Sequence, residues 1–160
     1  MAGEKSSFVT TINDTDPSNN GKSYKCTISG TNYNQLLGKT IGDAIDGIFI
    51  GEGEITLAGY TLEISGGSDK TGTPMRNELL GGALKEILVT ASQGYKGHKI
   101  VNKKSKRYRY KPDGLRKRRT FRGATITQDT RQINLKVVKH GNKSLAEIFP
   151  SSTGDSASED

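Results

Sequence analysis

The sequence of 160 residues contains no tryptophan and a single cysteine, Cys26, and aromatic residues make up only 6% of it. One cysteine excludes an internal disulfide and is typical of a chain that works in a reducing compartment. Hydrophobic residues amount to 31%, which limits the size of the core that the chain can build. We therefore expect a partner to supply part of the stability of this protein.

Long apolar segments are also absent. Residues 1–7 lack the apolar region of a secretion signal, and no apolar run approaches the roughly 20 residues that cross a bilayer. His98 and His140 have no Cys or carboxylate neighbours at metal-ligand spacing. Asp43 and Asp46 are flanked by glycines and are predicted to cap turns rather than to act as an acid and a base. No catalytic residue, cofactor, metal, membrane or small-molecule substrate is expected, and the predicted location is the cytoplasm.

Positive charge is concentrated in one segment, residues 96–122. This segment holds 13 of the 24 Lys and Arg residues and one acid, Asp113, whereas the rest of the chain has 11 basic and 16 acidic residues. Like charges at this density cannot be buried without counter-charges, so the segment is expected in solvent or on a polyanion such as nucleic acid. A disordered basic loop or a nuclear-localisation run is the alternative interpretation.

The cationic segment divides into two parts with different patterns. In residues 107–111, Arg and Lys alternate with Tyr108 and Tyr110, so an extended chain would place the cations on one side and the rings on the other. The rings could pack on the protein or stack on bases. Residues 116–119 are four consecutive cations that would occupy both faces of any strand. This part is expected to lie against RNA or solvent and not in a strand with one buried face.

Short stretches of alternating apolar residues predict a mainly β fold: a small β-barrel or closed antiparallel sheet with short helical turns and a long basic extension. A hairpin is predicted from residues 8–12 and 24–28, which flank turn-forming residues. The other predicted strands are at residues 48–50, 60–64, 84–91 and 133–138, and the helical turns are at 33–37 and 143–149. Residues 7–149 are predicted to form one domain between a flexible N-terminus, 1–6, and a disordered acidic tail, 151–160.

A long loop rich in Gly, Ser and Thr begins at residues 66–76. Gly67 and Gly72 have the spacing of a phosphate-binding loop, but Thr73-Pro74 stands where Lys and Ser or Thr are required, and no helix follows. Nucleotide binding is therefore excluded. We predict an elaborate turn in which Asp69 accepts hydrogen bonds from neighbouring backbone amides.

The same loop, taken together with other segments, resembles the archaeal and eukaryotic small-subunit ribosomal protein family S-six-e. The segments that carry the resemblance are Gly66 to Arg76, Arg118-Arg119-Thr120-Phe121-Arg122-Gly123, Gln132-Ile133-Asn134-Leu135, Leu37 to Gly47 and Gly21-Lys22-Ser23-Tyr24. The resemblance covers residues 8–145, nearly all of the chain that is expected to fold.

The chain also departs from the S-six-e pattern. Thr73 stands where members usually carry an aromatic residue, and residues 84–86 are less basic than in other members, so this strand is not assigned to RNA. The long, phosphorylatable C-terminal helix of eukaryotic members is missing. These departures indicate an archaeal-type member.

The resemblance implies a structural constituent of the small ribosomal subunit, not an enzyme. Such a protein binds and stabilises small-subunit ribosomal RNA beside neighbouring ribosomal proteins, and so serves translation. A free RNA- or DNA-binding protein, such as an RNA chaperone or chromatin-type protein, is the alternative that composition leaves open. The expected RNA-binding residues are Lys70, Arg76, Lys96, Lys99, Lys103, Lys104, Lys106, Arg107, Arg109, Lys111, Arg116, Lys117, Arg118, Arg119 and Arg122.

Overall fold

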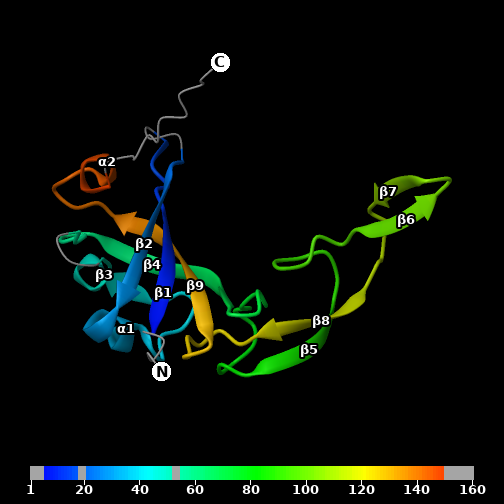
Figure 1. Ribbon diagram of the computed structural model, residues 1–160, viewed down its shortest axis with the longest axis horizontal. Coiled ribbons are helices and arrows are strands. Elements are labelled where there is room, and N and C mark those ends of the chain that lie inside the picture. The colour runs from blue at the N-terminus through cyan, green and yellow to red at the C-terminus, as the bar shows by residue number, and fades with distance from the viewer. Residues whose placement is uncertain (1–5, 18–20, 52–54, 150–160) are drawn as a thin grey trace, which may run out of the picture.

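A five-stranded sheet forms the body of the protein (Figure 1). The computed structural model describes residues 6–17, 21–51 and 55–149, so the predicted acidic tail and nearly all of the predicted flexible N-terminus lie outside the described residues. The strands of the sheet, in spatial order, are β2 (Ser23–Ser29), β1 (Ser7–Asn13), β9 (Thr130–Lys139), β4 (Thr61–Asp69) and β3 (Ala44–Asp46).

The sheet mixes strand directions and is open at both edges within the described residues. β1 and β2 form the predicted antiparallel hairpin, but β1 pairs in parallel with β9, which is antiparallel to β4. The prediction of a mainly β protein is confirmed, whereas the strands of the described residues show neither a closed sheet nor a wholly antiparallel one. Alternating apolar residues show which face of a strand is buried, but they carry no information about the direction in which the strand pairs.

Irregular pairing along β4 curls the sheet into half a barrel. The register between β4 and β9 shifts after Thr61, after Ile64 and after Ser68, and such shifts bend a strand and increase its twist. Gly67 lies in this region, and a Cβ atom added to it would stand 2.3 Å from the backbone oxygen of Gln132. Only glycine allows the two strands to approach this closely.

The main core packs against the five-stranded sheet. Phe8, Ile64 and Leu135 from three neighbouring strands are at most 1% exposed. Helix α1 (Gly30–Leu36), close to the predicted helical turn, packs Tyr33 against Phe8 with 4.2 Å between the ring centroids. Helix α2 (Leu145–Ile148) confirms the second predicted turn and buries Leu145 in the same core. No helix in the described ranges is long and apolar enough to cross a membrane.

The prediction of a buried strand at residues 48–50 is wrong. Residues Gly47–Phe49 form a 3-10 helix, η2, and the Ile48 side chain is 54% exposed. The reason is local, because the Asp46 carboxylate accepts a hydrogen bond from the Ile48 amide and starts the turn. Asp43 Oδ2 accepts the backbone amide of Thr40, three residues earlier, at 2.7 Å, so the prediction that both acids cap turns is confirmed.

Residues 84–122, here called the arm, lie outside the five-stranded sheet. β5 (Leu84–Val89) and β8 (Lys117–Arg122) pair as an antiparallel ribbon, and β6 (Lys99–Lys103) and β7 (Lys106–Tyr110) pair as a hairpin. Figure 1 shows the ribbon leaving the sheet at one side and the hairpin beyond it. The arm thus contains the whole cationic segment and places it away from the main core.

A second, small core holds the arm together. Val89, Tyr95 and Phe121 are at most 6% exposed and pack against Leu79 and Ile87. Two of these residues, Val89 and Phe121, come from the ribbon, and Tyr95 comes from the loop that follows β5. The loop between β5 and β6 therefore folds back onto one face of the ribbon.

Candidate nucleic-acid interface

The two most specific motifs of the sequence, residues 66–76 and residues 118–123, lie against each other. The first was predicted to be a loop throughout, but its residues 66–69 pair with β9 as the end of β4, and the loop proper follows them. Met75 and Arg122 form a parallel β-bridge. The Arg122 amide donates to the Pro74 oxygen at 2.9 Å, and the Arg76 amide donates to the Arg122 oxygen at the same distance. The ribbon of the arm is therefore attached to the rest of the protein through this loop.

A buried ion pair strengthens this junction. Arg122 Nε donates to Asp69 Oδ2 at 3.1 Å, and the side chains are 10% and 1% exposed. Arg122 Nη1 also donates to the backbone oxygen of Gly82 at 3.0 Å and to the carboxylate of Asp129 at 3.2 Å. The Arg122 guanidinium is thus largely occupied by protein groups.

Asp69 is held in its charged form by its surroundings. Its other carboxylate oxygen, Oδ1, accepts the backbone amides of Thr71 and Thr73 and the Thr71 hydroxyl at 2.7 to 2.9 Å. This confirms the predicted turn. Burial acts to raise the pKa of Asp69, but the hydrogen bonds from Thr71, Thr73 and Arg122 outweigh it, so the pKa lies below its ordinary value.

The Arg76 side chain also makes most of its contacts with residues of the arm. Its guanidinium lies 5.3 Å from the centroid of the Phe121 ring and pairs with Glu78 at 2.9 Å. It further donates to the Ser92 hydroxyl and to the Gln93 oxygen. Lys70, from the same loop, is exposed.

The four consecutive cations, residues 116–119, were predicted to avoid a half-buried strand. Arg116 lies in the loop before β8, and the other three are the first residues of β8. Lys117, Arg118 and Arg119 pair with β5, yet all are exposed, and burial begins only at Phe121. A strand does form here, and one face of its ribbon carries the second core, in which Val89, the pairing partner of Lys117, and Phe121 are buried. The prediction that these cations avoid a strand with one buried face is therefore wrong, although their own side chains are exposed. The expectation of a solvent-facing position for these cations is met.

The hairpin shows the predicted alternation in β7. Arg107 and Arg109 share one face, and Tyr108 and Tyr110 share the other, where they are 51% and 46% exposed. The rings therefore do not pack into the body of the protein. The tight turn at Lys104 and Ser105 has φ angles of 46° and 60°, the left-handed region that a two-residue hairpin turn of type I′ requires.

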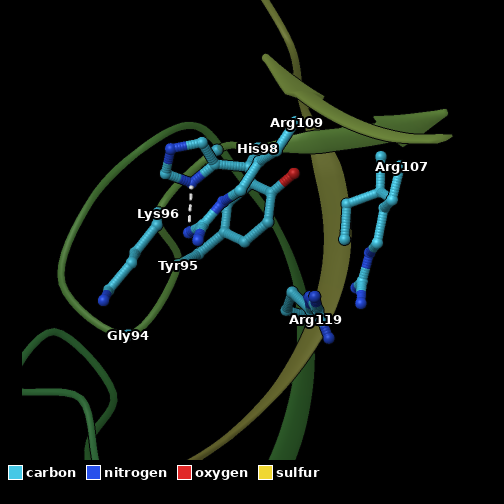
Figure 2. Close-up of a pocket in the computed structure, with 9 residues that line it drawn as sticks. Gly94, Tyr95, Lys96, His98, Arg107, Arg109 and Arg119 are labelled. Carbon is cyan, nitrogen blue, oxygen red and sulfur yellow. Dashed lines mark hydrogen bonds between the residues drawn. The ribbon is translucent and has the colours of Figure 1, made fainter. Parts of the chain in front are cut away.

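The arginine face of the hairpin turns toward the ribbon and encloses a depression of about 500 Å³, here called the basic pocket (Figure 2). It is lined by Gly94, Tyr95, Lys96, Gly97, His98, Ile100, Arg107, Arg109 and Arg119. The Arg119 guanidinium lies 5.3 Å from the centroid of the Tyr95 ring, and Arg109 is hydrogen-bonded to His98 Nδ1 at 3.1 Å. The lining carries four Lys and Arg side chains and no carboxylate.

The cationic environment affects the pKa of His98. Desolvation and then the charges of Arg109, Lys111 and Lys96 hold its pKa below the ordinary value of 6.5. The imidazole is therefore neutral at physiological pH and accepts the Arg109 hydrogen bond through Nδ1. This bond points Arg109 into the pocket.

Of the fifteen predicted RNA-binding residues, Arg76 and Arg122 are committed to protein contacts. The others are exposed: Lys70, Lys96, Lys99, Lys103, Lys104, Lys106, Arg107, Arg109, Lys111, Arg116, Lys117, Arg118 and Arg119. All of these except Lys70 lie in the arm. No cluster of three or more His, Cys, Asp or Glu residues suited to a metal ion occurs among the residues that the structure describes.

Comparison with known proteins identifies the family. Residues 11–150 match a family model described as Ribosomal protein S6e. The chain belongs to the ribosomal protein S6e family. The family is one of ribosomal proteins and not of enzymes, so the expectation of a non-enzymatic protein is confirmed. The resemblance that the sequence motifs indicated is confirmed with it.

Archaeal S6e family members are similar over most of the chain. The protein named "Small ribosomal subunit protein eS6" from Archaeoglobus fulgidus is 40% identical over 129 residues, which cover 81% of this chain and 87% of that protein. The protein of the same name from Thermoplasma acidophilum is 40% identical over 127 residues, 79% of this chain and 87% of the relative. The one from Haloarcula marismortui is 35% identical over 139 residues, 87% of this chain and 93% of the relative.

The structure adds two residues to this S6e family member's candidate site that charge counting overlooked, Tyr95 and His98. Neither is a cation at neutral pH, so neither contributed to the charge anomaly. A sequence signal did exist, in the run Gly94-Tyr95-Lys96-Gly97. An aromatic residue and a lysine between two glycines indicate a tight loop that presents a ring beside a charge.

Proposed function

We propose that this protein is a structural component of the small ribosomal subunit that binds small-subunit ribosomal RNA through the cationic arm, in the cytoplasm and beside neighbouring ribosomal proteins. The observation that carries the proposal is the exposure of twelve cations on one arm, residues 96–119, with a single acid among them. The names of the archaeal relatives, small ribosomal subunit proteins, support the same assignment.

The arm acts by neutralising phosphates. Each Lys or Arg that meets a phosphate releases condensed counterions, which favours binding and makes it dependent on salt. Arginine adds planar, two-pronged hydrogen bonds to phosphate oxygens. Because these contacts go to the backbone, the arm recognises RNA shape more than RNA sequence. The arm in this proposal is the long basic extension expected from the sequence.

Arg122 and Arg76 have a different task in this proposal. They hold the base of the arm against residues 66–76, and this contact fixes the position from which the exposed cations project. Their guanidinium groups already contact Asp69, Asp129, Glu78 and the Phe121 ring. The direct RNA contacts are assigned to the thirteen exposed residues.

The experiment replaces three exposed cations on the ribbon, Arg116, Arg118 and Arg119, with alanine. The triple variant is expected to fold and to bind small-subunit RNA more weakly, with the slope of log affinity against log salt reduced by about 3. It is also expected to be missing from small subunits purified from cells. The control changes Lys25, Lys136 and Lys139 to alanine, which removes the same charge from exposed positions of the five-stranded sheet.

Two results separate this proposal from its alternative. Normal occupancy of the Arg116, Arg118 and Arg119 variant in purified subunits would exclude the arm as the RNA-binding element. A free nucleic-acid binder, in contrast, would not cosediment with the small subunit in fixed proportion at moderate salt. Cosedimentation of the unmodified protein therefore decides between a ribosomal component and a free RNA chaperone.

A further inference from the structure

Tyr95 is held in one position at the centre of the arm. Its backbone amide and carbonyl both bond to Ser92, at 2.9 and 2.8 Å, and close a tight turn. Gly94 has a φ of +82°, and a Cβ atom there would stand 2.6 Å from the Phe121 ring. The loop therefore needs glycine beside Tyr95 and presents the ring in a defined orientation.

The phenolic oxygen of Tyr95 lacks a partner. Tyr95 is only 6% exposed, and its hydroxyl is shielded from solvent. This hydroxyl nevertheless makes no hydrogen bond to any residue that the structure describes. A buried hydroxyl normally finds a partner, since burying it unpaired is unfavourable. The second core alone does not explain the tyrosine, because a phenylalanine would fill the same space without an unpaired oxygen.

The side chains around this hydroxyl are mostly hydrogen-bond donors. Tyr95 lines the basic pocket and also an adjoining pocket of about 410 Å³ that contains Arg116 and Lys117. Neither lining includes a carboxylate. Figure 2 shows the ring among Arg107, Arg109, Arg119 and the His98 imidazole, which already accepts from Arg109. The lining therefore offers the Tyr95 hydroxyl no anionic acceptor from the protein itself.

We propose that the basic pocket binds the backbone phosphate of an unpaired RNA nucleotide, with Tyr95 Oη donating to a phosphate oxygen and Arg107, Arg109 and Arg119 neutralising its charge. This inference rests on the proposed function and specifies which feature of the RNA the arm selects. The exposed Arg107 and Arg109 side chains can shift to admit the phosphate.

The shape of the pocket favours an unpaired nucleotide over a duplex. The pocket is a depression between the hairpin and the ribbon, with room for a few groups of atoms and not for a double helix. The phosphates of a regular A-form duplex are fixed in continuous rows along a stiff helix, whereas the backbone of a bulge or loop can bend and place a single phosphate in a concave site. Recognition of RNA shape would then come from one concave site within a broadly cationic surface.

The test compares two RNAs with the full-length protein at constant salt: a hairpin whose stem carries a bulge of unpaired nucleotides, and the same stem fully paired. The unmodified protein is expected to bind the bulged RNA about tenfold more tightly. Tyr95→Phe is expected to lose that preference, because it removes one charge-assisted hydrogen bond and keeps the ring. Tyr110→Phe removes the same hydroxyl from the opposite face of the hairpin and should keep the preference.

Stability measurements distinguish binding from packing. Since the Tyr95 hydroxyl is unpaired in the free protein, Tyr95→Phe is expected to leave the melting temperature unchanged or raised. A lower melting temperature would assign the hydroxyl to the internal structure of the arm and overturn the proposal. Inorganic phosphate and adenosine monophosphate serve as competitors, and displacement of RNA by either at micromolar concentration would reassign the pocket to a free small anion.

Failure of this inference differs from failure of the proposed function. If the unmodified protein binds both RNAs equally, and if the variant of Arg116, Arg118 and Arg119 binds both more weakly, the arm is an RNA-binding element without a selective pocket. If the unmodified protein binds neither RNA, the proposed function itself is wrong. If Tyr95→Phe binds the bulged RNA as tightly as the unmodified protein does, Tyr95 plays no part.

Discussion

Asp69 Oδ2 accepts a hydrogen bond from Arg122 Nε across 3.1 Å, and this contact joins the last residue of β4 to the last residue of β8. The two residues are 53 positions apart in the sequence. The contact therefore couples the five-stranded sheet to the arm and fixes where the exposed cations begin. Both residues belong to the segments by which the sequence resembles its family.

Removing Arg122 is expected to destabilise the protein. Arg122→Ala leaves the Asp69 carboxylate buried without its cation, which lowers the free energy of unfolding by about 3 kcal/mol or more. Urea denaturation of the full chain measures the loss. Arg118→Ala, in the exposed part of the same strand, should change stability by no more than about 0.5 kcal/mol. A loss below about 1 kcal/mol for Arg122→Ala would mean that the ion pair does not hold the arm.

The stability of the protein is expected to fall in acid through Asp69. Because the pKa of Asp69 in the folded protein lies below its value in the unfolded chain, the unfolded chain binds the proton more readily. The carboxylate thus contributes stability that is fully present above its ordinary pKa of 3.8 and is lost as the pH falls through the lower folded value. Asp69→Asn should flatten the dependence of the unfolding free energy on pH below about 5. An unchanged acid limb in this variant would assign the effect to other carboxylates.

RNA binding is expected to strengthen as the pH is lowered through the histidine range. In the free protein, desolvation and the neighbouring cations Arg109, Lys111 and Lys96 keep the pKa of His98 low. A phosphate in the basic pocket offsets those cations and raises the pKa, so binding takes up a proton and affinity rises below about pH 6.5.

Affinities measured at constant ionic strength between about pH 5.5 and 7.5 test this linkage, since His98→Gln should abolish most of the pH dependence. His140→Gln is the matched control, because His140 packs against Tyr60 beside the five-stranded sheet. An identical pH dependence in the protein with and without His98 would place the titrating group elsewhere.

The hairpin turn is expected to gain stability from glycine. Ser105 has a φ of +60°, a conformation that costs a residue with a Cβ atom about 1 kcal/mol. Ser105→Gly should therefore slow amide hydrogen exchange in β6 and β7 by about fivefold. Ser105→Ala keeps the Cβ atom and should bring no such gain. Equal exchange in the glycine and alanine variants would show that the turn conformation does not limit the stability of the hairpin.

Local sequence patterns predicted the elements that depend on local physics. Alternation predicted β1, β2 and much of β4 and β9, because one buried face imposes a period of two. Asp69 was predicted to bind neighbouring amides, and it does, since a short carboxylate reaches amides two to four residues away. The strand predicted at 48–50 failed because an apolar triplet does not distinguish a buried strand from a 3-10 turn that the preceding aspartate begins.

Contacts between distant segments were outside the reach of these patterns. Neither the parallel pairing of β1 with β9 nor the open edges of the sheet follow from alternation. Arg122 looked like one more cation of the basic segment, yet it is buried against Asp69. Tyr95 entered no prediction from the sequence, yet it lines the basic pocket.

The sequence by itself determined the chemistry of this protein: a small core, a single dense cluster of positive charge and the motifs of a ribosomal protein family. Composition and local spacing suffice for this, because charge and backbone propensity belong to individual residues and their neighbours. The tertiary structure alone decided which cations are exposed to solvent and which pair with other residues to hold the arm in place. That division depends on burial and on partners far along the chain, and these exist only once the strands have paired.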